Sequence, residues 1–147
     1  MTTSQRGIAL IKQFEGLKLN AYLCSANVPT IGYGNTYYPN GIKVKLGDKI
    51  SQEQAKELLK DILKKFEAIV NRKLKVKVSQ NKFDALVSHT YNTGGSDTLF
   101  RLINNGANEQ DIRSWIETRY ITANGVKLKG LIRRRKAESD LYFSKNI

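Results

Sequence analysis

The stretch SQEQAKELLKDILKKFEAIVNRKL, residues 51–74, decides the fold because it predicts one long helix. Apolar residues such as Leu59 and Ile62 recur at intervals of three or four, which places them on one helix face. Ser51 and Gln54 form a capping-box pattern, in which each side chain bonds the backbone N–H of the other residue. Lysines and acidic residues alternate on the opposite face, so we expect that face to meet solvent.

The residues before this helix predict a short helix and then a small β lobe. Thr3 or Ser4 is expected to cap the first helix, which ends near Glu15 because glycine follows. Strand-like alternation or strand-forming residues then recur in three stretches: residues 19–23, 30–34 and 42–46. Asn40-Gly41 is a hairpin signal. We therefore predict two or three short strands within a β lobe of about residues 17–48.

Shorter helices are predicted after the long one. They begin near Ser79, Asp97 and Asn108, and a last helix runs from about Leu131 after a turn at Asn124-Gly125. The elements predict an α+β fold that is mainly helical, in a single domain over residues 1–147. The helix at about 51–74 would link the β lobe to a helical lobe of about 75–147 and the N-terminal helix, with a cleft between the lobes.

The composition excludes several classes of protein. The 147 residues are 40% apolar, enough for one core, and the formal net charge is +12. Such charge attracts nucleic acid, a membrane surface or a bacterial wall. No apolar run approaches the ~18 residues of a membrane span, and no signal peptide is recognisable. With one cysteine, Cys24, and one histidine, His89, we expect no disulfide, metal or other cofactor.

Glu15 lies at the predicted end of the first helix, between the apolar residues Phe14 and Leu17. The partial negative charge of a helix C-terminus and apolar neighbours both favour the protonated carboxylic acid. An acid that keeps its proton near neutral pH can donate it to a leaving oxygen. On position alone, a surface glutamate that ends its helix is the simpler interpretation.

The segment that follows Glu15 resembles the active-site segment of the phage-type lysozymes, or endolysins, of glycoside hydrolase family 24. That family has a Glu, eight residues, an Asp, five residues and a Thr that begins a Thr-Ile-Gly-Tyr-Gly strand. Glu15, Cys24 and Thr30 occupy the three positions. Residues 85–94 resemble the family's Leu-Val-Ser to Asn-x-Gly stretch, and residues 130–138 resemble its Gly-Leu-Val-x-Arg-Arg-x-x-Glu ending.

The resemblance implies a lysozyme-like fold and hydrolysis of the β-1,4 bond between N-acetylmuramic acid and N-acetylglucosamine in peptidoglycan. Most members of the family invert the anomeric centre, which requires an acid and a base about 6.5–9.5 Å apart with a water between base and sugar. By resemblance, Glu15 is the acid and the Thr30 hydroxyl helps to hold the water.

Cys24 departs from the family's Asp, and residues 16–47 contain no Asp or Glu. A thiol of ordinary pKa ~8.5 is mostly protonated near neutral pH, although nearby cations lower that pKa. Cys24 could act as a thiolate base or as a nucleophile that retains configuration. Alternatively, Glu15 and a water on Thr30 act slowly without it, catalysis is lost in a wall-binding module, or oxidation to a sulfinate restores an acid. We favour a site role over a buried apolar cysteine.

Further residues are assigned smaller roles at the site. Substrate contacts are expected from four of them: Tyr33, Asn35, Asn92 and Thr93. Asn35 stands where the family commonly has His, and it cannot titrate. Arg134 or Arg135 is expected to pair with Glu15, which would favour the ionised carboxylate and oppose the effect of burial.

We therefore expect a monomeric phage or prophage endolysin that acts on peptidoglycan, with no membrane anchor and no nucleic-acid partner. It would be made in the cytoplasm of the infected or lysogenic host, and the family implies release to the wall through a separate holin. Two rivals remain. Cys24 motivates a catalytically impaired wall-binding module, and the basic segments 72–77 and 133–136 motivate a nucleic-acid-binding protein.

Overall fold

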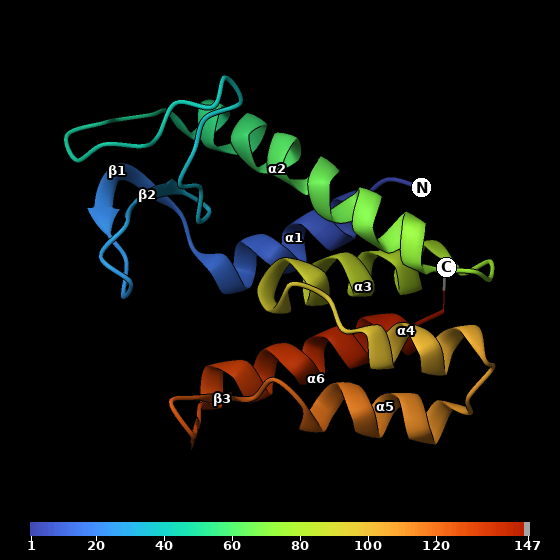
Figure 1. Ribbon diagram of the computed structural model, residues 1–147. Helices are drawn as coiled ribbons and strands as arrows, with labels where there is room; N and C mark the ends of the chain where they lie inside the picture. Colours follow the sequence, from blue (N-terminus) through green and yellow to red (C-terminus); the bar gives the residue numbers. More distant parts are fainter. Residues whose placement is uncertain (146–147) are drawn as a thin grey trace. The chain divides into compact units, whose positions relative to one another are not determined.

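The computed structural model describes residues 1–145 of the chain. In chain order its helices are α1 (Gln5–Glu15), α2 (Gln52–Lys73), α3 (Gln80–Thr93), α4 (Asp97–Asn104), α5 (Glu109–Thr118) and α6 (Lys129–Phe143) (Figure 1). The strands are β1 (Lys18–Leu23), β2 (Pro29–Gly32), β3 (Thr122–Ala123) and β4 (Val126–Lys127). Two compact units divide the chain: residues 12–65 form one, and residues 1–11 with those from Phe66 onward form the other.

The unit of residues 12–65 is built on the antiparallel pair β1 and β2. Lys18 pairs with Gly32 and Leu23 with Pro29, and a shift of register bends the ladder between them. Ile31 on β2 and Val44 in the following segment are buried, together with the apolar face of α2. Their burial fixes which face of the hairpin packs inward.

Residues 42–46, the third strand-like stretch, form no strand, so the unit has two of the two or three predicted strands. The strand-like pairing of this segment is a bridge between Tyr37 and Lys43, and among its apolar residues only Val44 is buried. The alternation fails because the chain turns at Lys45, whose carbonyl accepts the Asp48 N–H at 3.1 Å, so Leu46 lies on the turn and is exposed.

Two helices begin before residue 55. At α2, the Ser51 N–H donates to Gln54 Oε1 at 2.8 Å and the Gln54 N–H to Ser51 Oγ at 3.1 Å, so the capping box is confirmed. At α1, the Ser4 carbonyl accepts the Ile8 N–H at 3.0 Å, so the helix begins directly after Ser4. The Ser4 hydroxyl donates its proton to Asp84 and the Thr3 hydroxyl donates its proton to Glu67.

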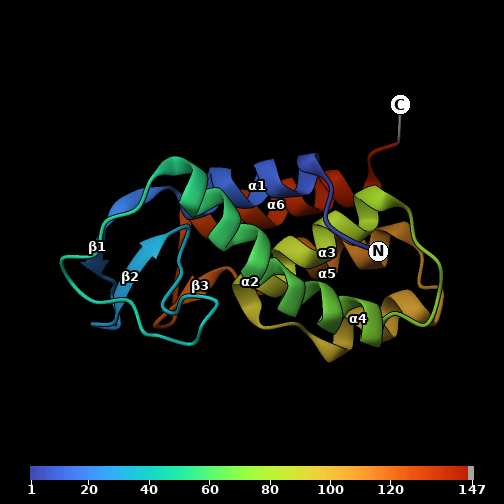
Figure 2. The same cartoon turned by 90° about the horizontal axis from the view of Figure 1, so that it is seen from above.

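The other unit has α3 at its centre. Residues 83–90 of α3 are all buried, α6 packs along α3, and α5 packs along α6 (Figures 1 and 2). Helices α3, α4 and α5 begin beside Ser79, Asp97 and Asn108 as predicted, and Ser79, Ser96 and Asn108 cap them. The last helix begins at Lys129, after the β3–β4 hairpin. No helix within residues 1–145 has the length and apolar character needed to cross a bilayer.

Candidate active site

Glu15 is the last residue of α1 and is half-buried. The helix ends there because Gly16 adopts φ +72° and its N–H bonds the Lys12 carbonyl at 3.1 Å. One turn earlier, Lys12 Nζ lies 5.6 Å from the centroid of the Tyr33 ring, which is itself buried. The end of α1 is thus held against the segment that follows β2, and the carboxyl group is carried on a fixed helix end.

Cys24 lies in the tight loop that joins β1 to β2. The Cys24 N–H donates to the Val28 carbonyl at 3.1 Å, and the Asn27 N–H donates to the Cys24 carbonyl at 2.8 Å. Asn27 has φ +60°, a left-handed conformation that asparagine tolerates better than most residues. The loop leaves Cys24 half-buried, and it brings Thr30, two residues beyond Val28, close to the sulfur.

The loop stabilises the thiolate form of Cys24. Hydrogen bonds from the backbone of Val28 and Ala26 and from the Thr30 side chain lower the pKa of the Cys24 thiol, and they outweigh its partial burial. The Thr30 hydroxyl also donates to the Val28 carbonyl at 2.8 Å. A hydroxyl has one proton, so Thr30 donates either to this carbonyl or to the sulfur. The two acceptors compete, and a charged sulfur is the stronger.

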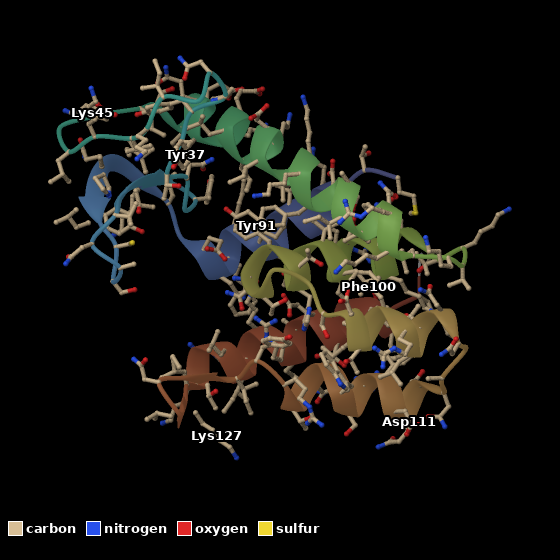
Figure 3. The ribbon with its side chains drawn as sticks, viewed as in Figure 1. Tyr37, Lys45, Tyr91, Phe100, Asp111 and Lys127 are labelled. Atoms are coloured by element: carbon tan, nitrogen blue, oxygen red, sulfur yellow. The ribbon has the colours of Figure 1, made fainter. Side chains whose placement is uncertain are left out.

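Asp48 is the first carboxylate after Glu15 in the sequence, and its side chain stabilises the loop structure of its own unit. Its side chain accepts the Lys45 N–H at 3.0 Å and the Tyr38 hydroxyl at 2.7 Å. These bonds lower the pKa of Asp48, whereas burial and the same carboxylate raise the pKa of Tyr38 to about 12. Tyr37 and Lys45 on this segment are labelled in Figure 3. Because Asp48 already holds two donors, Cys24 and Thr30 remain the candidates for the base side.

Asn35 is buried, with 2% of its surface exposed. Its Nδ2 donates to the Leu58 carbonyl of α2 at 3.4 Å, and its Oδ1 has no hydrogen-bond partner among the described residues. The side chain therefore lies inside its own unit against α2. A substrate contact by Asn35 stays a prediction.

Asn92 and Thr93 lie together at the C-terminal end of α3, in the other unit. The Thr93 hydroxyl donates to the His89 carbonyl at 2.8 Å, and Asn92 Oδ1 accepts a bond from Arg135. Gly94 then ends the helix with φ +87°. The exposed Asn92 is held by α6 at this end.

Arg134 and Arg135 are buried and share one carboxylate. Arg134 Nε lies 3.2 Å from Glu138 Oε2, and Arg135 Nη1 lies 3.0 Å from Glu138 Oε1. The Ser88 hydroxyl of α3 donates to the same group at 2.5 Å. Sequence reasoning missed Glu138, although arginines three and four residues before a glutamate on one helix were the signal. Pairing of either arginine with Glu15 stays a prediction.

His89 is held neutral in an aromatic cluster. Its ring centroid lies 6.1 Å from that of Trp115 and 5.7 Å from that of Tyr120. Burial, with the cations Arg135 and Arg134 nearby, lowers the pKa of His89 to about 3. This buried histidine therefore stays unprotonated at neutral pH and packs as part of the aromatic cluster.

A glutamate on a helix end, a hydroxyl on a hairpin and a largely helical second unit are the features expected of a lysozyme-like glycoside hydrolase. Residues 12–138 match the family described as phage lysozyme. The chain belongs to the phage lysozyme family. The predicted family and its mainly helical α+β fold are thereby confirmed.

The chain is similar to several endolysins. It is 37% identical to the endolysin of Acyrthosiphon pisum secondary endosymbiont phage 1, over 98% of this chain and 99% of that protein. It is 38% identical to the endolysin of Bacillus phage B103, and it covers 57% of that longer protein.

Two solved structures have the same fold. The endolysin from Escherichia coli O157:H7 phage FAHEc1 superposes with a TM-score of 0.87 and 41% identity, covering 97% of this chain and 94% of that one. The muramidase domain of SpmX from Asticaccaulis excentricus superposes with a TM-score of 0.84 and 29% identity, covering 98% and 99%.

Proposed function

We propose that this phage lysozyme is a muramidase that cleaves the β-1,4 bond between N-acetylmuramic acid and N-acetylglucosamine in peptidoglycan. The family match and the fold shared with a muramidase domain support this assignment. The proposed mechanism rests on one observation: in the hairpin loop, backbone N–H groups and Thr30 stabilise a thiolate on Cys24.

Glu15 acts as the general acid. Its position at the end of α1 holds the carboxyl group on a rigid element, as proton donation to a defined oxygen requires. The proton passes from Glu15 to the glycosidic oxygen as the bond to the anomeric carbon breaks, and N-acetylglucosamine leaves with a hydroxyl group.

Cys24 and Thr30 act on the opposite side of the sugar. Thr30 holds a water, the Cys24 thiolate takes one proton from it, and the oxygen attacks the anomeric carbon with inversion. If the sulfur itself attacked, a glycosyl thioether would form and a later water would give retention. Proton NMR of the anomer first released distinguishes the two roles of Cys24. Inversion would support Cys24 as the base, and retention would support Cys24 as the nucleophile.

The test of the whole proposal is the Glu15→Gln variant, assayed with purified peptidoglycan. Wild-type protein should release muropeptides with new muramic-acid reducing ends. The variant should release none while it keeps its melting temperature and still sediments with the wall. Normal release by the variant would remove Glu15 from the mechanism. Sedimentation without release by the wild type would identify a binding module instead.

Release to the wall and the substrate contacts belong to the same proposal. The protein acts as a monomer at the wall after synthesis in the host cytoplasm and release through a holin, and it needs no nucleic acid. Tyr33, Asn92 and Thr93 contact the glycan, and Arg134 or Arg135 positions Glu15. Alanine at Asn92 should raise KM more than it lowers kcat if that contact forms.

A further inference from the structure

A shallow cavity of about 460 Å³, open to solvent, lies where the C-terminal end of α2 meets α4. Four cations from two helices and the segment after α2 line it: Arg72, Lys73, Lys75 and Arg101. Asp97 is the one carboxylate among its lining residues. The lining therefore carries a net charge of about +3, and none of these residues is used by the mechanism above.

The floor of this cavity is fixed by Asn104. Its Nδ2 donates to the Lys73 carbonyl at 2.9 Å, and its Oδ1 accepts the Lys75 N–H at 2.8 Å. One side chain of α4 therefore binds the backbone on both sides of residue 74. The two lysines are thereby placed by a backbone that cannot move independently of α4.

The lysine ammonium groups are also positioned. Lys73 Nζ lies 2.6 Å from Asp97 and 5.9 Å from the centroid of the Phe100 ring, which Figure 3 labels on α4. Lys75 Nζ donates to the Arg72 carbonyl at 3.0 Å. This bond and the one from Asn104 cover carbonyls whose partial negative charge at the end of α2 would repel an anion.

Arg72 and Arg101 are exposed and come from the two helices that border the cavity. Guanidinium groups present forked donors that match the oxygens of a phosphate better than ammonium groups do. Lys73 lowers the pKa of the Asp97 carboxyl, and Arg101 adds a smaller effect in the same direction, so the pair between Asp97 and Lys73 stays ionised. The cavity thus combines two positioned lysines with two exposed arginines.

We propose that this cavity binds the phosphate groups of an anionic phosphodiester polymer of the bacterial wall. The choice of a wall polymer rests on the proposed function, which brings the protein to that polymer. The lining favours a polymer strand over a membrane, because Phe100 is its one large apolar residue and is buried. Four cations in one concave site also suit a flexible strand better than duplex DNA, which binds along an extended basic face.

The test is calorimetric titration with poly(glycerol phosphate), with inorganic phosphate and with sodium acetate at 50 mM salt. The probe polymer should bind, phosphate should compete with it weakly, and acetate should not compete. The double variant Arg72→Gln/Arg101→Gln should weaken polymer binding at least about tenfold and reduce the slope of log K against log salt by one to two. Both substitutions leave the Asn104 bonds and the Lys73–Asp97 pair in place.

The matched control is Lys43→Gln/Lys49→Gln, which removes two exposed charges from the other unit. It should change polymer binding less than about twofold. An equal loss of binding in both double variants would show that net charge alone attracts the polymer, and it would overturn the proposed site. Tighter binding to duplex DNA, or to vesicles of phosphatidic acid, through the same arginines would overturn the assignment to a wall polymer. The titration is run on Glu15→Gln protein, so its outcome is independent of whether the chain cleaves glycans.

Discussion

The loop around Cys24 supplies the donors that a negative charge on its sulfur requires. The pKa of the Cys24 thiol is lowered by the Val28 and Ala26 backbone and by Thr30. An aspartate has an ordinary pKa of ~3.9, whereas a thiolate forms only above the pKa of its thiol. In the proposed mechanism, Cys24 therefore makes the base side dependent on pH.

The wild-type hydrolysis rate should rise with pH through the lowered pKa of Cys24. Cys24→Asp should move this rise to the acid range, and Cys24→Ser should reduce kcat about 10²-fold or more, since an alcohol does not ionise there. Release of reducing ends from peptidoglycan between pH 4 and 10 measures all three. Unchanged rates in Cys24→Ser would exclude the thiolate.

Stability should depend on pH through His89. Its pKa is about 3 in the folded chain and 6.5 ordinarily, so the unfolded chain binds the proton first as the pH falls. The stability it contributes is complete above pH 6.5 and is lost toward pH 3, on the order of 3 kcal/mol by pH 4. Denaturant unfolding at pH 8 and 4 measures the loss.

The matched variant is His89→Phe, which keeps a ring beside Trp115 and Tyr120 but cannot titrate. It should lose less stability than the wild type between the two pH values, because carboxylates titrate in both proteins and only His89 differs. Equal losses would show that His89 is accessible to protons in the folded state.

Among the elements, α3 and α6 are joined by a buried cluster of charges. Glu138 holds Arg134 and Arg135 and accepts from Ser88. Glu138→Gln leaves two buried cations without their anion and should cost about 3–5 kcal/mol of unfolding free energy. Urea unfolding checks this value. Glu109→Gln, which removes an exposed partner of Arg113, should cost less than about 1 kcal/mol.

Sequence patterns predicted the elements well where the determining contacts are local. The Ser51–Gln54 box and the Ser79 cap depend on residues three apart, and both are present. The Ser4 hydroxyl donates to Asp84, a partner distant in the sequence that no local pattern indicates. Residues 42–46, the third strand-like stretch, form no strand because a turn at Lys45 interrupts the alternation. Long-range partners and turns thus account for what the local patterns did not predict.

The candidate site also has a part that the sequence predicts and a part that it does not. The spacing of Glu15, Cys24 and Thr30 could be recognised in the sequence, and a single hairpin joins Cys24 and Thr30. The backbone donors that stabilise the thiolate could not be predicted from the sequence, because the direction of their N–H groups depends on the loop conformation at Asn27. Burial of Asn35 was missed because its acceptor, Leu58, lies on another element.

On the scale of the whole molecule, a net charge of +12 should govern association with the anionic wall. Raising salt from 50 to 500 mM shortens the screening length from over 10 Å to below 8 Å, so binding to insoluble peptidoglycan should fall at least tenfold. Co-sedimentation of the Glu15→Gln variant measures it. The melting temperature serves as the control and should change little. Salt-independent binding would show that glycan contacts alone hold the protein.

The single proton of the Thr30 hydroxyl has a consequence for the speed of proton transfer. Rotation about the Cβ–Oγ1 bond redirects it from the Val28 carbonyl to the sulfur, while the Cys24 N–H keeps that carbonyl bonded. No heavy atom needs to move for the hairpin to accommodate either charge state. The loop is therefore preorganised for both ends of the reaction, and a turnover need not wait for the backbone to rearrange.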